Sequence, residues 1–99
     1  MAKTVSKEHS MELYETISSI KSADECYRFF QDICSITELR TIEQRFEVAR
    51  LLSEGQVYTD IMEKAHASSA TISRVNRVLN YGTGTLSELL DRRNGGMEK

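Results

Sequence analysis

The stretch that most constrains the fold is Tyr58–Val78, with the sequence YTDIMEKAHASSATISRVNRV. Apolar residues recur in it at helical spacing on both sides of a short polar segment, which predicts two amphipathic helices joined by a tight turn. Ile61 and Ala65 in the first helix, and Ile72 and Val75 in the second, fall at positions that hold two such helices together. The pattern therefore predicts a helix-turn-helix unit.

The turn of this unit is predicted to fall on His66. Glycine is most common at this point of such units because the backbone tends to adopt a positive φ there. Histidine tolerates that conformation better than most residues do. We therefore expect a left-handed backbone at His66 and an N-cap at Ser68, whose hydroxyl can accept a hydrogen bond from the first turn of the second helix.

The rest of the chain also favours helix, since it has no proline and only five glycines. Ser22–Glu25 and Thr85–Glu88 each match a capping box and predict the starts of two helices. Thr37 is the expected N-cap of a third helix over about 38–53, and Gly55 is the expected left-handed stop after it.

These signals predict an all-α fold of about six helices in a single domain, residues 1–99. Residues 1–10 and 94–99 are expected to be flexible, and the helix-turn-helix is expected at about 58–78.

Composition excludes several classes of protein. The formal net charge of −2 argues against a general nucleic-acid coat protein. Apolar runs of three or four residues are too short to cross a membrane, and the first ten residues lack a secretory signal, so we expect a cytoplasmic protein. Cys26 and Cys34 are separated by roughly 12 Å along a helix, which is too far for a disulfide. No Cys or His pair has metal-ligand spacing, so neither a metal nor a cofactor is predicted.

The second helix of a helix-turn-helix lies in the major groove of DNA, so small and hydroxyl side chains at its start allow close approach to the bases. Long cations beside them can reach phosphate or guanine. The predicted partner is a double-stranded DNA operator, contacted by Ser68, Ser69, Ala70, Thr71, Ser73, Arg74, Arg77 and Lys64. No catalytic motif or glycine-rich phosphate loop is present, so we do not predict an enzyme.

The first two predicted helices carry more apolar residues than a chain of this size needs for its own core. A second copy of the chain could bury them, and a two-fold pair would read two DNA half-sites. The sequence thus predicts a homodimer, on the basis of Met11, Tyr14, Ile17, Phe29, Phe30 and Ile33.

The segment LLSEGQVYTDIMEKAHASSATISRVNRVL resembles the core of the bacterial tryptophan repressor, and more closely the Trp-repressor-like YerC/YecD group. The resemblance extends from about Ile33 to Leu79, and its most specific element is Ala70-Thr71-Ile72-Ser73-Arg74. It implies an intertwined homodimer with helices of both chains in one core. It also implies operator binding through Ser69, Ala70 and Ser73.

The corepressor site of that family is not fully matched. In the repressor two arginines sandwich the tryptophan indole, and a glycine after the second leaves room for the ring. Arg74 matches the second arginine, but Val75 replaces the glycine and Val78 replaces a serine that holds the ligand's amino group. Gln44 aligns with the first arginine, although the adjacent Arg45 could take that place. These differences argue against tryptophan as the effector.

The sequence thus favours a homodimeric transcriptional regulator that does not respond to tryptophan. Repression is favoured over activation. One alternative is a sensor of an unknown small molecule, with its pocket near Gln44, Arg45 and Arg74. Another is a helical protein–protein interaction module that does not bind DNA.

Overall fold

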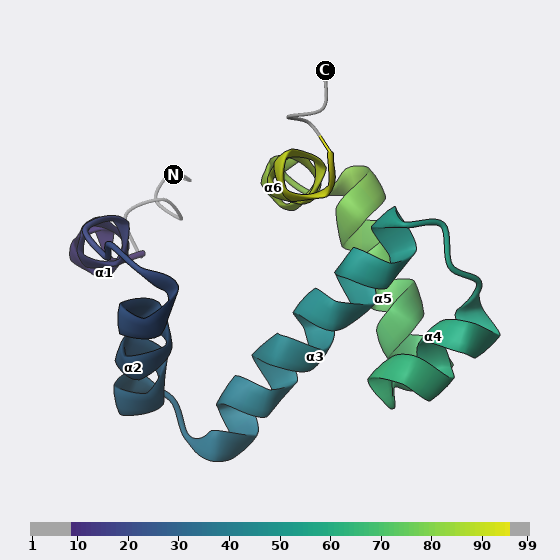
Figure 1. Ribbon diagram of the computed structural model, residues 1–99, viewed down its shortest axis with the longest axis horizontal. Helices are drawn as coiled ribbons and strands as arrows, with labels where there is room; N and C mark the ends of the chain where they lie inside the picture. The colour runs from purple at the N-terminus through teal and green to yellow at the C-terminus, as the bar shows by residue number, and fades with distance from the viewer. Residues whose placement is uncertain (1–8, 96–99) are drawn as a thin grey trace, which may run out of the picture. The chain divides into compact units, whose positions relative to one another are not determined.

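The computed structural model describes residues 9–95, and this range contains six α-helices and no strands. The predicted all-α fold is therefore confirmed. Of the chain ends predicted to be flexible, 1–10 and 94–99, residues 1–8 and 96–99 lie outside the described range. Within it, Ser10 caps the first helix and Asn94 is the last residue of the sixth. The helices, labelled in Figure 1, are α1 (Met11–Ser18), α2 (Ala23–Ile33), α3 (Ile36–Ser53), α4 (Tyr58–Ala65), α5 (Ser69–Tyr81) and α6 (Thr85–Asn94).

The chain divides into two compact units, and the boundary between them falls within α3, between Leu39 and Arg40. The first unit contains α1, α2 and the start of α3. The second contains the rest of α3 together with α4, α5 and α6. The single domain expected from chain length stays a prediction.

In the first unit, serine caps begin both helices. The Ser10 hydroxyl accepts a hydrogen bond from the Leu13 N–H (3.2 Å), and the Ser22 hydroxyl accepts one from the Glu25 N–H (3.0 Å). The Glu25 carboxylate accepts in return from the Lys21 N–H (2.9 Å), which is one residue before the donor that the capping box predicts. Neither α1 nor α2 has a buried residue.

The start of α3 differs from the sequence prediction. Ser35, and not Thr37, caps it: the Ser35 hydroxyl accepts from the Glu38 N–H (3.1 Å), and the Glu38 carboxylate accepts from the Ser35 N–H (2.8 Å). This reciprocal pair is a complete capping box, so two donors at the helix start are bonded where a cap at Thr37 would bond one. Thr37 lies inside the first turn of α3.

The core of the second unit is formed by side chains from all four of its helices and from the α4–α5 turn. On α3, burial is confined to the C-terminal part. Ile42 and Phe46, which lie earlier on this helix, remain 44% and 42% exposed. The buried residues are Val48, Ala49, Leu51, Ile61, Ala67, Ile72, Val75 and Leu90.

The end of α3 carries a small ion-pair network. Arg50 contacts the carboxylates of Glu47 (2.7 Å) and Glu54 (2.9 Å) on successive turns. The hydrogen bond from Arg50 holds the pKa of Glu47 below its ordinary value. Gly55 follows with φ 84°, which confirms the predicted left-handed stop.

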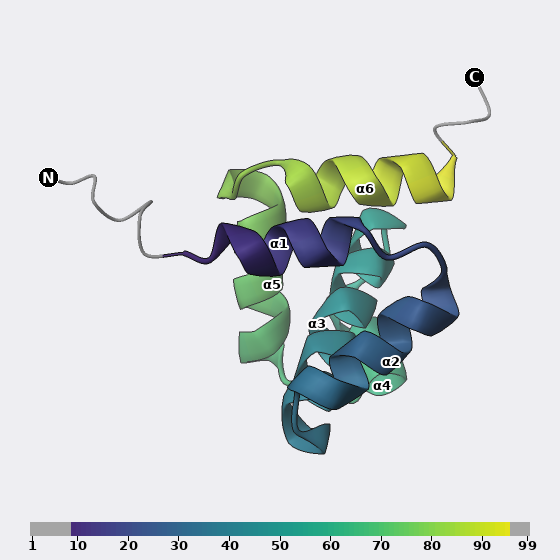
Figure 2. The same cartoon turned by 90° about the vertical axis from the view of Figure 1, so that its left-hand side faces the viewer.

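The start of α6 also differs from the sequence prediction. Gly84, with φ 94°, is the N-cap, and the Thr83 hydroxyl accepts from the Thr85 N–H (3.3 Å). Thr85 is therefore the first helical residue and not the cap. Only residues 82–84 connect α5 to α6, so the chain changes direction sharply near Gly84, a residue without a side chain. Figure 2 shows α6 crossing the C-terminal end of α5.

Candidate nucleic-acid interface

The turn between α4 and α5 has the backbone that the sequence predicts. His66 follows the last residue of α4 with φ 53° and ψ 44°, and its N–H donates to the Met62 carbonyl. It is the only non-glycine residue with a positive φ in the described part of the chain. This left-handed residue ends α4 and redirects the chain towards α5.

A side chain from α3 reaches this turn. The Gln44 amide nitrogen donates to the carbonyl oxygens of His66 (2.8 Å) and Ala65 (3.4 Å). Sequence reasoning placed Gln44 beside a ligand pocket and missed this contact. Helical spacing is the sequence signal that could have indicated this contact, since Gln44 lies one turn before the fully buried Val48 and shares its face of α3.

The first turn of α5 is anchored by Ser68. Its hydroxyl accepts from the Thr71 N–H (3.1 Å), which confirms the predicted N-cap, and donates to the Thr71 hydroxyl (3.2 Å). Thr71 is half-buried. Both side chains therefore hold the start of the helix in place.

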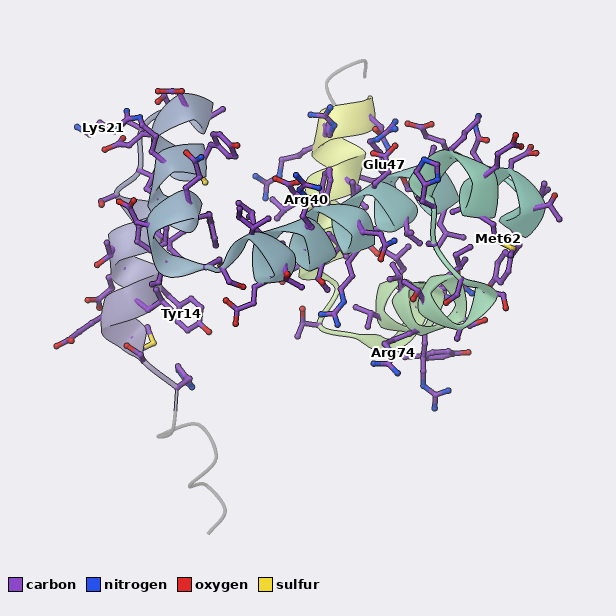
Figure 3. The ribbon with its side chains drawn as sticks, turned by 90° about the horizontal axis from the view of Figure 1, so that it is seen from below. Tyr14, Lys21, Arg40, Glu47, Met62 and Arg74 are labelled. Carbon is purple, nitrogen blue, oxygen red and sulfur yellow. The ribbon has the colours of Figure 1, made fainter. Side chains whose placement is uncertain are left out.

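The two faces of α5 are chemically distinct. Ile72 and Val75 are buried against the core, whereas the opposite face is open to solvent. The helix carries no Asp or Glu, so the positive end of its dipole and its arginines both attract an anion. Figure 3 shows Arg74 extending outward from α5. The exposed predicted contact residues are Ser69, Ala70, Ser73, Arg74 and Arg77.

Lys64 lies in the last turn of α4, and its ammonium donates to the Gln56 amide oxygen (2.9 Å). Arg74 and Arg77 form no ion pair within residues 9–95, in contrast to Arg50. Their guanidinium groups are thus available to an external anion. The predicted DNA contacts of all these residues stay predictions.

A cavity of about 390 Å³ opens between α3, α5 and the start of α6. Its walls are mainly apolar, and Arg45 and Arg74 contribute the two cations; the full lining is Ile42, Arg45, Phe46, Arg74, Val75, Val78 and Leu86. A smaller hollow of about 170 Å³ adjoins it and is lined by Arg45, Ala70, Thr71, Arg74 and Val75. Two of the three predicted pocket residues therefore lie together, whereas Gln44 lines neither hollow.

Residues 9–95 contain no group of three or more His, Cys, Asp and Glu side chains placed to hold a metal ion. No helix in this range is long and apolar enough to cross a membrane.

Two short helices joined by a left-handed turn and packed on a longer helix define a helix-turn-helix protein. The family model described as Trp repressor protein matches residues 8–94. The chain belongs to the Trp repressor family.

Relatives and solved structures agree with this assignment. The chain is 51% identical over 81 residues to the uncharacterised protein YerC of Bacillus subtilis, covering 82% of this chain and 78% of that protein. The crystal structure of a TrpR-like protein from Eubacterium eligens matches with a TM-score of 0.81 and 48% identity, over 86% of this chain and 88% of the other. A proposed Trp repressor from Staphylococcus aureus matches with a TM-score of 0.83 and 36% identity, over 91% and 93% of the two chains.

Proposed function

We propose that this protein is a sequence-specific DNA-binding transcriptional regulator that acts in the cytoplasm as a homodimer. Membership of the Trp repressor family and the helix-turn-helix geometry support this function. We favour repression over activation of transcription. In this proposal the protein catalyses no reaction and acts by occupying an operator.

The observation that carries the proposal is the solvent-exposed face of α5. Small side chains stand at its N-terminal end, so the backbone can approach base edges closely, and Ala70 can contact a thymine methyl group. Arg74 and Arg77 follow on the same face, one and two turns further along. At such a helix, short side chains usually contact the bases, and long cationic side chains usually reach guanine or phosphate.

The homodimer is supported by apolar surface that a single chain leaves uncovered. In the first unit Ile33 and Ile36 are 56% and 75% exposed. In the second unit Ile42, Phe46 and Val78 line the open cavity. Exposed apolar surface of this kind marks an interaction site, and in a two-fold pair the second copy presents the same surface.

The DNA claim is tested by selecting bound sequences from a random duplex pool. We expect the protein to enrich a palindrome whose half-sites are about 34 Å apart, one turn of the double helix. Arg74→Ala should weaken binding by roughly 1–3 kcal/mol and relax the sequence preference if Arg74 contacts a base. If Arg77 contacts phosphate, Arg77→Ala should weaken binding to all sequences alike. It should also reduce the slope of log K against log salt concentration by about one.

Arg93→Ala is the matched control, because it removes the same charge from α6. That helix follows the C-terminal end of α5, whereas the proposed contacts cluster towards the other end. It should leave the preferred sequence unchanged. A pool with no enriched motif would contradict the proposal and favour a protein–protein interaction module.

The homodimer is tested by light scattering at micromolar protein concentration. We expect about twice the chain mass of 11.3 kDa. Phe46→Glu, which places a charge in the exposed apolar wall, should shift the mass towards one chain. A monomer in the unmodified protein would overturn this part of the proposal.

A second candidate function is effector sensing, and the cavity next to Arg74 favours it. Its volume lies within the range of small-molecule pockets. Apolar walls with two guanidinium groups suit a ligand that has an apolar body and a carboxylate. Calorimetry with a panel of such carboxylates tests this function. Tryptophan is not expected to bind, since Val75 and Val78 both occupy the wall of the cavity.

A further inference from the structure

The contact between Gln44 and the α4–α5 turn has a consequence for DNA reading. The last carbonyls of a helix have no partner within the helix and need one elsewhere. At the end of α4, the Met62 carbonyl accepts from the N–H groups of His66 and Ala67. The carbonyls of Ala65 and His66 accept instead from the Gln44 side chain, at 3.4 Å and 2.8 Å.

The chemistry of the amide group fits this position. A glutamine amide nitrogen carries two hydrogens, which match two carbonyl oxygens. The opposite orientation of the amide would place oxygen against oxygen. Gln44 is half-buried, and Val48 and Leu51, which are almost fully buried, follow it at helical spacing on α3. The donor therefore lies on α3 one turn before the residues that the core buries.

The acceptors lie directly before the start of α5. Ala67, which is 6% exposed, follows His66, and the N-cap Ser68 comes next. A constraint on the His66 carbonyl therefore acts two residues before the cap of the helix that carries the proposed base contacts.

We infer that Gln44 is a positioning residue that fixes the orientation of α5 on α3 from within the chain, so that the helix is set for DNA before any effector binds. This inference rests on the proposed DNA-binding function and adds to it. It assigns to one α3 side chain the alignment of the reading helix. The relevant readout is discrimination between sequences, because misalignment affects base contacts more than non-specific phosphate attraction.

The first experiment measures affinity for the selected operator and for a non-specific duplex at the same salt concentration. Gln44→Ala should lower the ratio of the two affinities about three- to tenfold, in line with the loss of one or two side-chain hydrogen bonds. Gln44→Glu should lower it further, because a carboxylate of the same shape faces two carbonyl oxygens. Gln31→Ala, the same truncation at an exposed site on α2, should leave the ratio unchanged.

The second experiment measures amide hydrogen exchange in free protein, under conditions where circular dichroism shows each variant to be folded. Gln44→Ala should speed exchange about three- to tenfold in peptides that cover residues 66–71, and leave peptides from α6 unchanged. A general loss of stability would speed exchange in both regions. That outcome would overturn the inference.

The two experiments separate this inference from the proposed function. If the unmodified protein selects no DNA sequence, the proposed function fails and the exchange measurement alone decides the role of Gln44. If the protein selects an operator but Gln44→Ala keeps both its discrimination and its turn exchange, the inference is wrong and the proposed function stands.

Discussion

Replacing His66 with glycine should stabilise the protein, which is unusual for a substitution that removes a large side chain. His66 adopts φ 53°, a conformation that costs an L-residue about 1–2 kcal/mol. Glycine avoids this cost but loses about 0.5–1 kcal/mol more conformational entropy on folding. Near the centres of these two ranges the difference is a net gain of about 0.5–1 kcal/mol.

The structure isolates this effect well. The described contacts of His66 are made by its backbone: the N–H donates to Met62, and the carbonyl accepts from Gln44. Glycine keeps both groups. The imidazole is exposed to solvent, so little packing is lost with it.

The assay is thermal and urea unfolding at one fixed protein concentration, because any association of chains makes apparent stability depend on concentration. A gain of this size raises Tm by about 2–8 °C in a chain of this length. Gly55→Ala is the mirror control. Gly55 has φ 84° and open space around its Cα, so alanine there should cost about 1 kcal/mol through backbone strain alone.

The reasoning would be refuted if His66→Gly lowered stability while Gly55→Ala behaved as expected. That result would mean that the imidazole contributes more than the left-handed backbone costs.

Three further perturbations address the cap, the core and the ion pairs. Ser68→Ala removes the acceptor of the Thr71 N–H and should cost about 1 kcal/mol in urea unfolding; an unchanged midpoint would show that the cap is dispensable. Ile72→Ala at a fully buried site should cost about 2–5 kcal/mol and Ile72→Val about 1 kcal/mol, and equal losses would contradict the packing argument. The pKa of Glu47 in the folded state is lowered by Arg50. The stability that this ion pair contributes is therefore complete above the ordinary glutamate pKa of about 4.3 and is lost as pH falls through the lowered pKa. Glu47→Gln should therefore lower stability at neutral pH and weaken its fall in acid, as measured by urea unfolding from pH 7 to pH 3.

Local signals predicted the helix-turn-helix well because each one depends on neighbouring residues. His66 has a positive φ, Ser68 caps α5, and Ile61 and Ile72 are buried, as their spacing and chemistry indicate. The Ser22–Glu25 box begins α2 for the same reason. Caps and amphipathic spacing are properties of a few consecutive residues.

Two helix starts show how local signals compete. Ser35–Glu38 is itself a capping box, and it prevails over Thr37 because two hydrogen bonds form where one was expected. At α6 the pattern Thr85–Glu88 is present, but the three-residue connection places the change of chain direction at Gly84, which becomes the N-cap. Sequence matching alone does not rank such alternatives, because the connection length and the direction of the next helix decide between them.

The sequence by itself determined the helix-turn-helix, its left-handed turn and the character of the two faces of α5. Hydrogen bonds within one turn of chain and the 3.6-residue period set these features. Only the tertiary structure decided that Arg45 and Arg74 share a cavity while Gln44 binds the turn between α4 and α5. That choice depends on how α3 is rotated about its axis, and the rotation is set by the burial of Val48, Ala49 and Leu51 against helices that come later in the chain.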